Sequence, residues 1–232
     1  MEQKKLTELL ADAVGDADLH PTEIPSIDLY VDQITSLTSE KLKEGTERFH
    51  DRVLTKTMIN NYSKDGLISP IKGKKYSKDH ILQMLLVYSL KNTLSIGEIK
   101  RILQNLYAYP DYDSAMLEQI YANFLSVKEL ERRTASEQVK RLIEDCGLDL
   151  SREQDYLTLI LGLSQMSSYL KNMAQALLEE HYPDLEEARA REEQERKEKK
   201  KEEKTTAKKA KKEEKKEDKK ADKTATEQEE TT

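Results

Sequence analysis

The chain has 232 residues, with 39 Lys and Arg against 45 Asp and Glu, one Cys and no Trp. The single cysteine excludes a disulfide framework and a metal site built from several cysteines, and no apolar stretch approaches the roughly 20 residues of a membrane-spanning helix. Residues 1–12 are charged and lack the apolar core of a signal peptide, so we expect a cytoplasmic protein outside the membrane.

Charge is distributed unevenly along the chain. Residues 1–51 carry 5 basic and 12 acidic side chains, residues 52–104 carry 10 and 3, and residues 105–185 carry 7 and 14. The net charge therefore changes from −7 to +7 and back to −7. A cationic segment of this kind is typical of a surface that binds a polyanion. The alternative is an ordinary solvated surface, and composition alone does not decide between the two.

Two helices are predicted before residue 43. The first spans 2–14, and the second spans 26–42 with the apolar stripe Ile27, Val31, Ile34 and Leu37. Residues 15–25 form a polar link between them. The link contains Asp16, Asp18, His20 and Glu23 but lacks the glycine and the spacing of a calcium loop. We therefore interpret it as a solvated linker.

The next predicted helix has clear boundaries. Thr55 can cap its start by accepting a hydrogen bond from an N–H of the first turn, and Gly66 suits the left-handed residue that ends a helix. Leu67 and Ile68 then point inward, and Pro70 prevents the helix from continuing. The residues of this helix that face the core are Met58, Ile59 and Tyr62.

A short basic segment and two further helices follow. Residues 71–76, IKGKKY, are predicted to form a small hairpin with Gly73 at its tip. Ser77 caps the helix behind it, which has a broad apolar face. The next helix opens with a capping box, formed by Ser95 and Glu98.

The C-terminal third is predicted to be helical. One helix starts at Asp113 or Ser114 and keeps its apolar spacing up to Gly147, with Cys146 as a small core residue. A second capping box, in the sequence SREQ from residue 151 to residue 154, opens a helix of close to 30 residues.

This last helix carries a continuous apolar stripe. Such a long helix usually packs along a comparable partner, so we expect pairing with its symmetry mate in a homodimer or with the helices of 114–146. The stripe consists of Tyr156, Leu159, Ile160, Leu163, Met166, Tyr169, Leu170, Met173 and Leu177.

The segment 186–232 differs from the rest of the chain. It holds 17 basic and 16 acidic residues, and its only apolar residues are Ala. Such a segment cannot bury enough surface to offset the entropy lost on ordering. We therefore predict a disordered, charged tail.

The motifs of residues 53–104 resemble the DNA-binding domain of the MerR family of transcriptional regulators. The matching segments are LTKTMINNYSKDGLISP, GKKYSKDHI and LSIGEIKRIL. The resemblance implies a winged helix-turn-helix that binds double-stranded DNA as a homodimer. Residues 24–107 also resemble an uncharacterised bacterial domain-of-unknown-function family with the same core, through IPSIDLYVDQI, LTKTMINNY and KKYSKDHI.

A recognition helix needs short polar side chains that reach base edges and cations that contact phosphates. The predicted contacts of the helix come from Thr55, Lys56, Thr57, Asn60, Asn61, Tyr62 and Lys64. The predicted phosphate contacts of the wing come from Lys72, Lys74, Lys75, Tyr76 and Lys78. The alternative for the two asparagines is ordinary helix surface, and for the lysines a solvated turn.

Two function classes stay open at this point. The first is a sequence-specific transcriptional regulator. The second is a protein–protein interaction module that keeps the winged-helix fold without binding DNA, because Asn60 stands where the MerR family has arginine and the flanking segments are acidic. An enzyme is not expected, since the seven glycines form no phosphate-binding motif and the four histidines are scattered. We predict no catalytic residue, metal or cofactor, and no effector can be named.

The predicted fold class is all-α. It combines a MerR-like winged helix-turn-helix core and small β wing with a helical C-terminal region and a disordered tail. The predicted divisions are an N-terminal helix and linker, the winged domain, a dimerisation or effector region and the tail, at 1–23, 24–107, 108–185 and 186–232 respectively.

Overall fold

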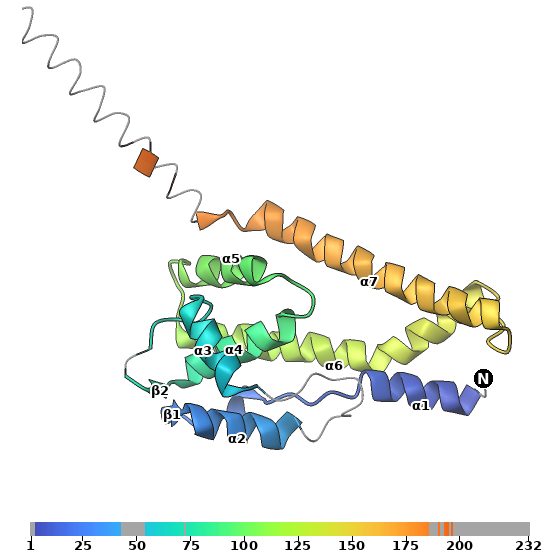
Figure 1. Ribbon diagram of the computed structural model, residues 1–232, viewed down its shortest axis with the longest axis horizontal. Helices are drawn as coiled ribbons and strands as arrows, with labels where there is room; N and C mark the ends of the chain where they lie inside the picture. Colours follow the sequence, from blue (N-terminus) through green and yellow to red (C-terminus); the bar gives the residue numbers. More distant parts are fainter. Residues whose placement is uncertain are drawn as a thin grey trace, which may run out of the picture. The chain divides into compact units, whose positions relative to one another are not determined.

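The computed structural model describes residues 3–42, 54–71 and 73–185, together with 190, 193, 194 and 196. The chain divides into two compact units, Met1–Pro183 and Asp184–Thr232. The predicted disorder of the tail falls almost entirely outside the described residues. The described helices and strands of the first unit (Figure 1) are α1 Gln3–Ala13, η1 Pro21–Glu23, β1 Leu29–Tyr30, α2 Val31–Leu42, α3 Lys56–Lys64, β2 Lys75–Tyr76, α4 Lys78–Leu90, α5 Ile96–Tyr107, α6 Ser114–Asp145 and α7 Glu153–His181.

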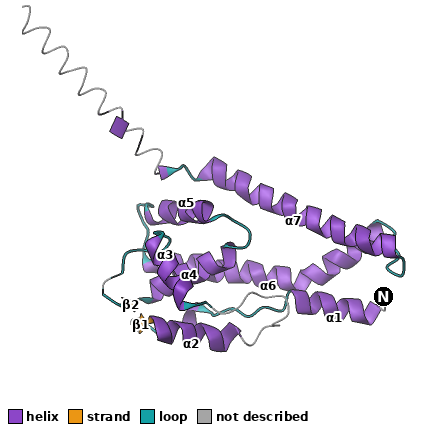
Figure 2. Ribbon diagram, in the orientation of Figure 1, coloured by secondary structure: helices purple, strands orange, loops and turns teal. Residues whose placement is uncertain are grey.

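The described part of the chain is mostly helical, with one small two-stranded sheet (Figure 2). This confirms the all-α prediction at the level of fold class. None of the helices in this part of the chain combines the length and the apolar character that a membrane span requires.

Helix α4 is the centre of the core. Every side chain from Ile81 to Val87 is buried, including the polar Gln83. The Oε1 atom of Gln83 accepts hydrogen bonds from the backbone N–H and the hydroxyl of Ser69, at 2.8 and 3.1 Å. Helices α3 and α6 and strand β2 all pack against α4. A helix that is apolar on all sides is stable only when it is surrounded, so α4 determines where its neighbours lie.

The two strands are far apart in the sequence. Leu29 lies opposite Tyr76 and Tyr30 opposite Lys75 in an antiparallel pair. The prediction of a local hairpin within 71–76 is therefore wrong, because the partner of β2 is the strand that precedes α2. This pairing brings the basic loop before β2 to the start of α2.

The helix predicted over 26–42 begins later than expected, at Val31. The Oε1 atom of Gln33 accepts a hydrogen bond from the backbone N–H of Tyr30 at 2.9 Å and so caps the helix start. Ile27 is 67% exposed and does not belong to the apolar stripe, whereas Ile34 is fully buried. The physical reason is the strand pair, since a long-range contact overrides the local helical spacing.

The cap predicted for α5 is confirmed and the cap predicted for α7 is wrong. At α5 the Glu98 N–H donates to Ser95 Oγ at 3.2 Å, and the Ser95 N–H donates to Glu98 Oε2 at 2.7 Å. At α7 the helix begins only at Glu153. The hydroxyl and the N–H of Ser151 both donate to Asp149 Oδ1, at 2.7 and 3.0 Å, so Asp149 caps a turn and Ser151 does not cap the helix.

Helix α6 is continuous over 32 residues. It starts as predicted, because Asp113 Oδ1 accepts a hydrogen bond from the Met116 N–H at 2.7 Å. Cys146, at its C-terminal end, is exposed. The prediction of a buried core cysteine is therefore wrong, because α6 buries side chains only near its start, at Leu117 and Tyr121.

Helix α7 runs back from α6 after the turn at 146–152 (Figure 1). Its far end is tied to α5. The Arg101 Nε donates to the carbonyl of Tyr182, and the Asn105 Nδ2 donates to the carbonyl of Pro183 at 2.9 Å. Gln175 Nε2 also donates to Glu98 Oε1 at 2.5 Å. The predicted stripe of α7 is only partly covered, and Met173 is 61% exposed.

The acidic link between α1 and η1 is bound to α6. Arg132 Nη2 lies 2.7 Å from both Asp16 Oδ1 and Asp18 Oδ2, and Lys128 Nζ pairs with both carboxylates. Burial raises the pKa of Asp16, but hydrogen bonds from Lys128 and Arg132 outweigh it and hold that pKa below its usual range. The prediction of a solvated linker is wrong here, because α6 supplies the two cations from more than 100 residues away along the chain.

Candidate nucleic-acid interface

Helix α3 is anchored by one face. Ile59 is fully buried and Tyr62 is 6% exposed, while Met58 is half-buried. The Oγ1 atom of Thr55 accepts a hydrogen bond from the Met58 N–H at 3.2 Å and caps the helix as predicted. The helix therefore has a fixed rotation about its axis, and its opposite face must point outward.

The end of α3 is set by Gly66. Its φ of +69° is the left-handed conformation that side chains disfavour. The Leu67 N–H donates to the Tyr62 carbonyl at 2.9 Å and the Gly66 N–H donates to the Ser63 carbonyl at 3.3 Å, which is the Schellman pattern. Leu67 is fully buried. The chain therefore turns toward the core directly after the helix ends.

The outward face of α3 consists of polar and cationic side chains. Every residue predicted to lie there is exposed, and these residues are Lys56, Thr57, Asn60, Asn61 and Lys64. Among the described residues, Lys64 has no ion-pair partner. The two amide side chains and three ammonium or hydroxyl groups can donate to phosphates, and the asparagines can also pair with adenine edges.

The basic loop before β2 is the second part of the surface. Gly73, with a φ of +77°, turns the chain, and Lys74 and Lys75 after it are exposed. The Lys75 ammonium lies 5.1 Å from the centre of the Tyr30 ring, within the range of a cation–π contact. Lys72 lies outside the described residues. Lys75 thus belongs to the strand pair, and Lys74 lies in the turn before it.

The loop and the start of α3 contact neighbouring residues of β1 and α2. Lys56 Nζ lies 3.4 Å from Asp32 Oδ1 in the first turn of α2, and both side chains are more than half exposed. Asp32 follows Tyr30 closely in the sequence, and Tyr30 pairs with Lys75. Lys56 of α3 and Lys75 of β2 thus contact residues that lie two positions apart in the sequence, Asp32 and Tyr30. A salt bridge this exposed contributes little to stability.

Besides Thr55, which caps α3, three predicted contact residues have structural roles. Tyr62 and Tyr76 are 6% and 3% exposed, so neither ring faces solvent. Burial raises the pKa of Tyr62, which stays a neutral phenol. The Lys78 ammonium lies 2.8 Å from Glu118 Oε1 and joins α4 to α6. A phosphate contact from Lys78 would require this salt bridge to break.

Tyr30 and Asp32 belong to this surface and were not predicted. The local pattern placed both in a helix, and no local signal pairs residues 29–30 with 75–76. An exposed aromatic residue two positions before an acid is too common to serve as a signal. Only the strand pairing identifies Tyr30 as the support of Lys75.

Residues 19–124 match the family described as Domain of unknown function (DUF1836). The matched segment extends from the residues before η1 into the first third of α6, so it contains α3, the strand pair and the basic loop. The match agrees with the resemblance to a family of unknown function seen over 24–107. No curated protein and no solved structure matches the chain.

Proposed function

We propose that the protein is a sequence-specific, double-stranded-DNA-binding transcriptional regulator of the cytoplasm, built on a MerR-like winged helix-turn-helix. In this proposal α2 and α3 form the helix pair, and the loop of 71–75 with β2 forms the wing. No catalytic residue and no cofactor takes part.

The observation that carries this proposal is the outward face of α3. A helix whose apolar face is anchored by Ile59 and Tyr62 presents only polar and cationic groups to solvent. Its nine residues give a length of about 13 Å, at about 1.5 Å per residue. The major groove of B-DNA is about 12 Å wide and accepts one α-helix. Asn60 and Asn61 are then the candidates for base edges.

The cationic loop supports the proposal through its position. Lys74 and Lys75 are exposed, and Lys75 pairs with Tyr30, two residues before the Asp32 that contacts Lys56 of α3. Flexible ammonium groups suit phosphate contact, which positions a protein on the duplex without reading its sequence. The local net charge of +7 in residues 52–104 adds a sequence-independent attraction.

A homodimer is part of the proposal, and the exposed side of α7 is its surface. Tyr169, Met173 and Leu177 are 56%, 61% and 71% exposed. Exposed apolar patches of several hundred Å² commonly mark interaction sites in soluble proteins. A two-fold dimer would place two copies of α3 for two half-sites.

One observation favours a second function, a protein–protein interaction module without DNA binding. Asp32 forms a salt bridge with Lys56, and Glu118 forms one with Lys78. Both acids reduce the positive potential along the edge where phosphates would lie. In this alternative the polar face of α3 contacts a protein partner.

A filter-binding measurement with matched variants tests the proposal. We expect the full chain to retain its own upstream DNA more strongly than random duplex at two salt concentrations. Changing Lys74 and Lys75 together to Ala should weaken binding to both duplexes alike and reduce the slope of log K against log salt by about 0.9 per lost phosphate contact. Changing Asn60 or Asn61 to Ala should weaken the binding free energy by about 1–3 kcal/mol for the specific site and leave binding to random duplex unchanged.

Lys140→Ala is the matched control, because Lys140 lies on α6 and pairs with Glu137 at 2.9 Å. It should leave DNA binding unchanged. Equal small effects from all variants would indicate non-specific electrostatics. Absence of DNA affinity at low salt would contradict the proposal and favour the interaction module.

A further inference from the structure

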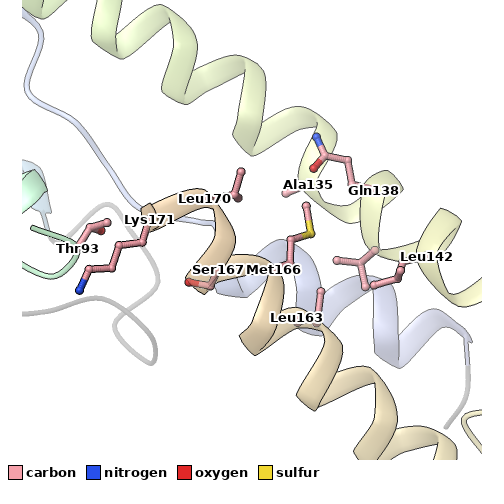
Figure 3. Close-up of a pocket in the computed structure, with 10 residues that line it drawn as sticks. Thr93, Ala135, Gln138, Leu142, Leu163, Met166, Ser167, Leu170 and Lys171 are labelled. Carbon is pink, nitrogen blue, oxygen red and sulfur yellow. The ribbon is translucent and has the colours of Figure 1, made fainter. Parts of the chain in front are cut away.

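A cavity of about 410 Å³ lies inside the hairpin of α6 and α7. Most of its wall is apolar, and Figure 3 shows Leu163 and Met166 of α7 pointing toward Leu142 of α6. The turn between α4 and α5 closes one end with Thr93. Cavities of this size and character are typical of small-molecule sites.

Helix α7 is held at both of its ends in the structure. One end of α7 is joined to α6 through the turn at 146–152. The other end is held by Arg101 and Asn105, which donate to the carbonyls of Tyr182 and Pro183. The apolar wall of the cavity between α6 and α7 is accessible, with Met166 42% and Leu170 55% exposed.

The polar end of the cavity is cationic. Lys171 is the one charged residue that lines it, and in Figure 3 its side chain extends toward Thr93 and away from Leu142. Among the described residues, Lys171 makes no salt bridge. It acts electrostatically on Glu98, whose carboxylate is already hydrogen-bonded by the Ser95 backbone and Gln175. The hydroxyl of Thr93 adds a second donor group at this end.

We propose that this cavity binds an amphipathic carboxylate, such as a medium-chain fatty acid. The apolar chain lies between Val139 and Leu142 of α6 and Leu163 and Met166 of α7. The carboxylate accepts hydrogen bonds from the Lys171 ammonium and the Thr93 hydroxyl. Charge complementarity selects this occupant, because an apolar slot with a single cation at one end suits a chain with a single negative head. The site is independent of DNA binding.

Calorimetry on the full chain tests this proposal, with three ligands that share one chain and differ in the head. Decanoate is anionic, decanol is neutral and decyltrimethylammonium is cationic, and each is used below its self-association concentration. We expect decanoate to bind in a saturable manner and raise the melting temperature. Decanol should bind more weakly, and the cationic ligand should bind weakest. Equal binding of all three would overturn the assignment of a carboxylate.

Two variants and one control locate the site. Lys171→Met keeps the apolar stem and should weaken the affinity for decanoate roughly five- to tenfold, while the affinity for decanol stays unchanged. Lys171→Arg keeps the positive charge and should bind decanoate like the unmodified chain. Val139→Phe fills the slot and should abolish binding of all three ligands without lowering the melting temperature. Lys140→Met, on α6 outside the cavity, should bind decanoate like the unmodified chain.

The remaining outcomes contradict the proposal. Decanoate binding that survives Val139→Phe would place the ligand elsewhere. If decanoate does not bind and Met166→Asp halves the mass measured by light scattering, a second copy of the chain fills the slot and the ligand site does not exist.

Discussion

Helices α4 and α7 are both rich in large apolar side chains, but the structure buries them to very different extents. Every side chain from Ile81 to Val87 of α4 is buried, whereas in α7, which is fully described, only Leu159 and Leu178 are. Helix α4 has neighbours on several sides, while α7 is held near its two ends. An apolar stripe thus indicates that a helix needs a partner without identifying that partner.

The largest effect is expected on the free energy of unfolding, when one leucine from each of the two helices is changed to alanine. Leu82 of α4 is fully buried and Leu177 of α7 is 71% exposed. Leu82→Ala should lower the free energy of unfolding by about 2–5 kcal/mol, because it removes apolar burial and leaves a cavity. Leu177→Ala should cost less than about 0.5 kcal/mol in dilute protein. Urea unfolding measures both, and similar losses would show that α7 is covered in solution.

The ion pairs that hold the N-terminal link to α6 give the next effect. Arg132→Gln should lower the free energy of unfolding by about 1–3 kcal/mol at neutral pH. The reason is that the two half-buried carboxylates then have Lys128 as their only cationic partner in this cluster. The pKa of Asp16 is lowered in the folded chain. Its stabilisation is therefore present above the unfolded value of about 4 and is lost as pH falls through the lower folded value.

The difference between the unmodified chain and Arg132→Gln should consequently shrink in acid. Urea unfolding at neutral pH and at about pH 2.5 measures it. A cost that is the same at both pH values would mean that the network acts by packing and not through its charges.

Assembly is the third way to test the comparison. If a symmetry mate covers α7, light scattering at micromolar concentration should give about twice the 26.8 kDa of one chain. Changing Met173 and Leu177 together to Asp should then reduce the mass to that of a monomer, with little change in the unfolding of each chain. These positions are better probes than Leu163 or Leu170, which line the cavity facing α6. A monomeric mass for the unmodified chain would contradict the dimer.

The smallest effect is expected from the tail. Residues 186–232 contain no apolar residue larger than Ala, so deleting them should change the free energy of unfolding by less than about 0.5 kcal/mol. Urea unfolding of the shortened chain measures this. A loss above roughly 1 kcal/mol would show that the tail packs on the folded unit.

Local patterns were sufficient for features whose causes are local. The caps at Thr55 and Ser95 and the end of α3 at Gly66 were predicted correctly. Each of them depends on residues within one helical turn. The cap predicted at Ser151 was wrong because the N–H and the hydroxyl of Ser151 donate to Asp149, two residues before it, in a turn that precedes the helix.

The candidate surface was predictable in part for the same reason. Helical spacing separates Ile59 and Tyr62 from Asn60 and Asn61, so the outward face of α3 followed from the sequence. The sequence did not predict which lysines are free to contact phosphates, because Glu118 of α6 forms a salt bridge with Lys78 of α4. The support of Lys75 by Tyr30 likewise depends on a strand pair that joins distant segments.

The sequence by itself determined the helical class, most helix boundaries and the rotation of α3, since periodicity and capping act over a few residues. Tertiary structure decided the rest. It made residues 29–30 a strand, placed Arg132 against Asp16 and Asp18, and left α7 apart from α6 so that a cavity remains between them. The physical reason is that long-range pairs form only when the core brings distant segments together, and here α4 determines which segments meet.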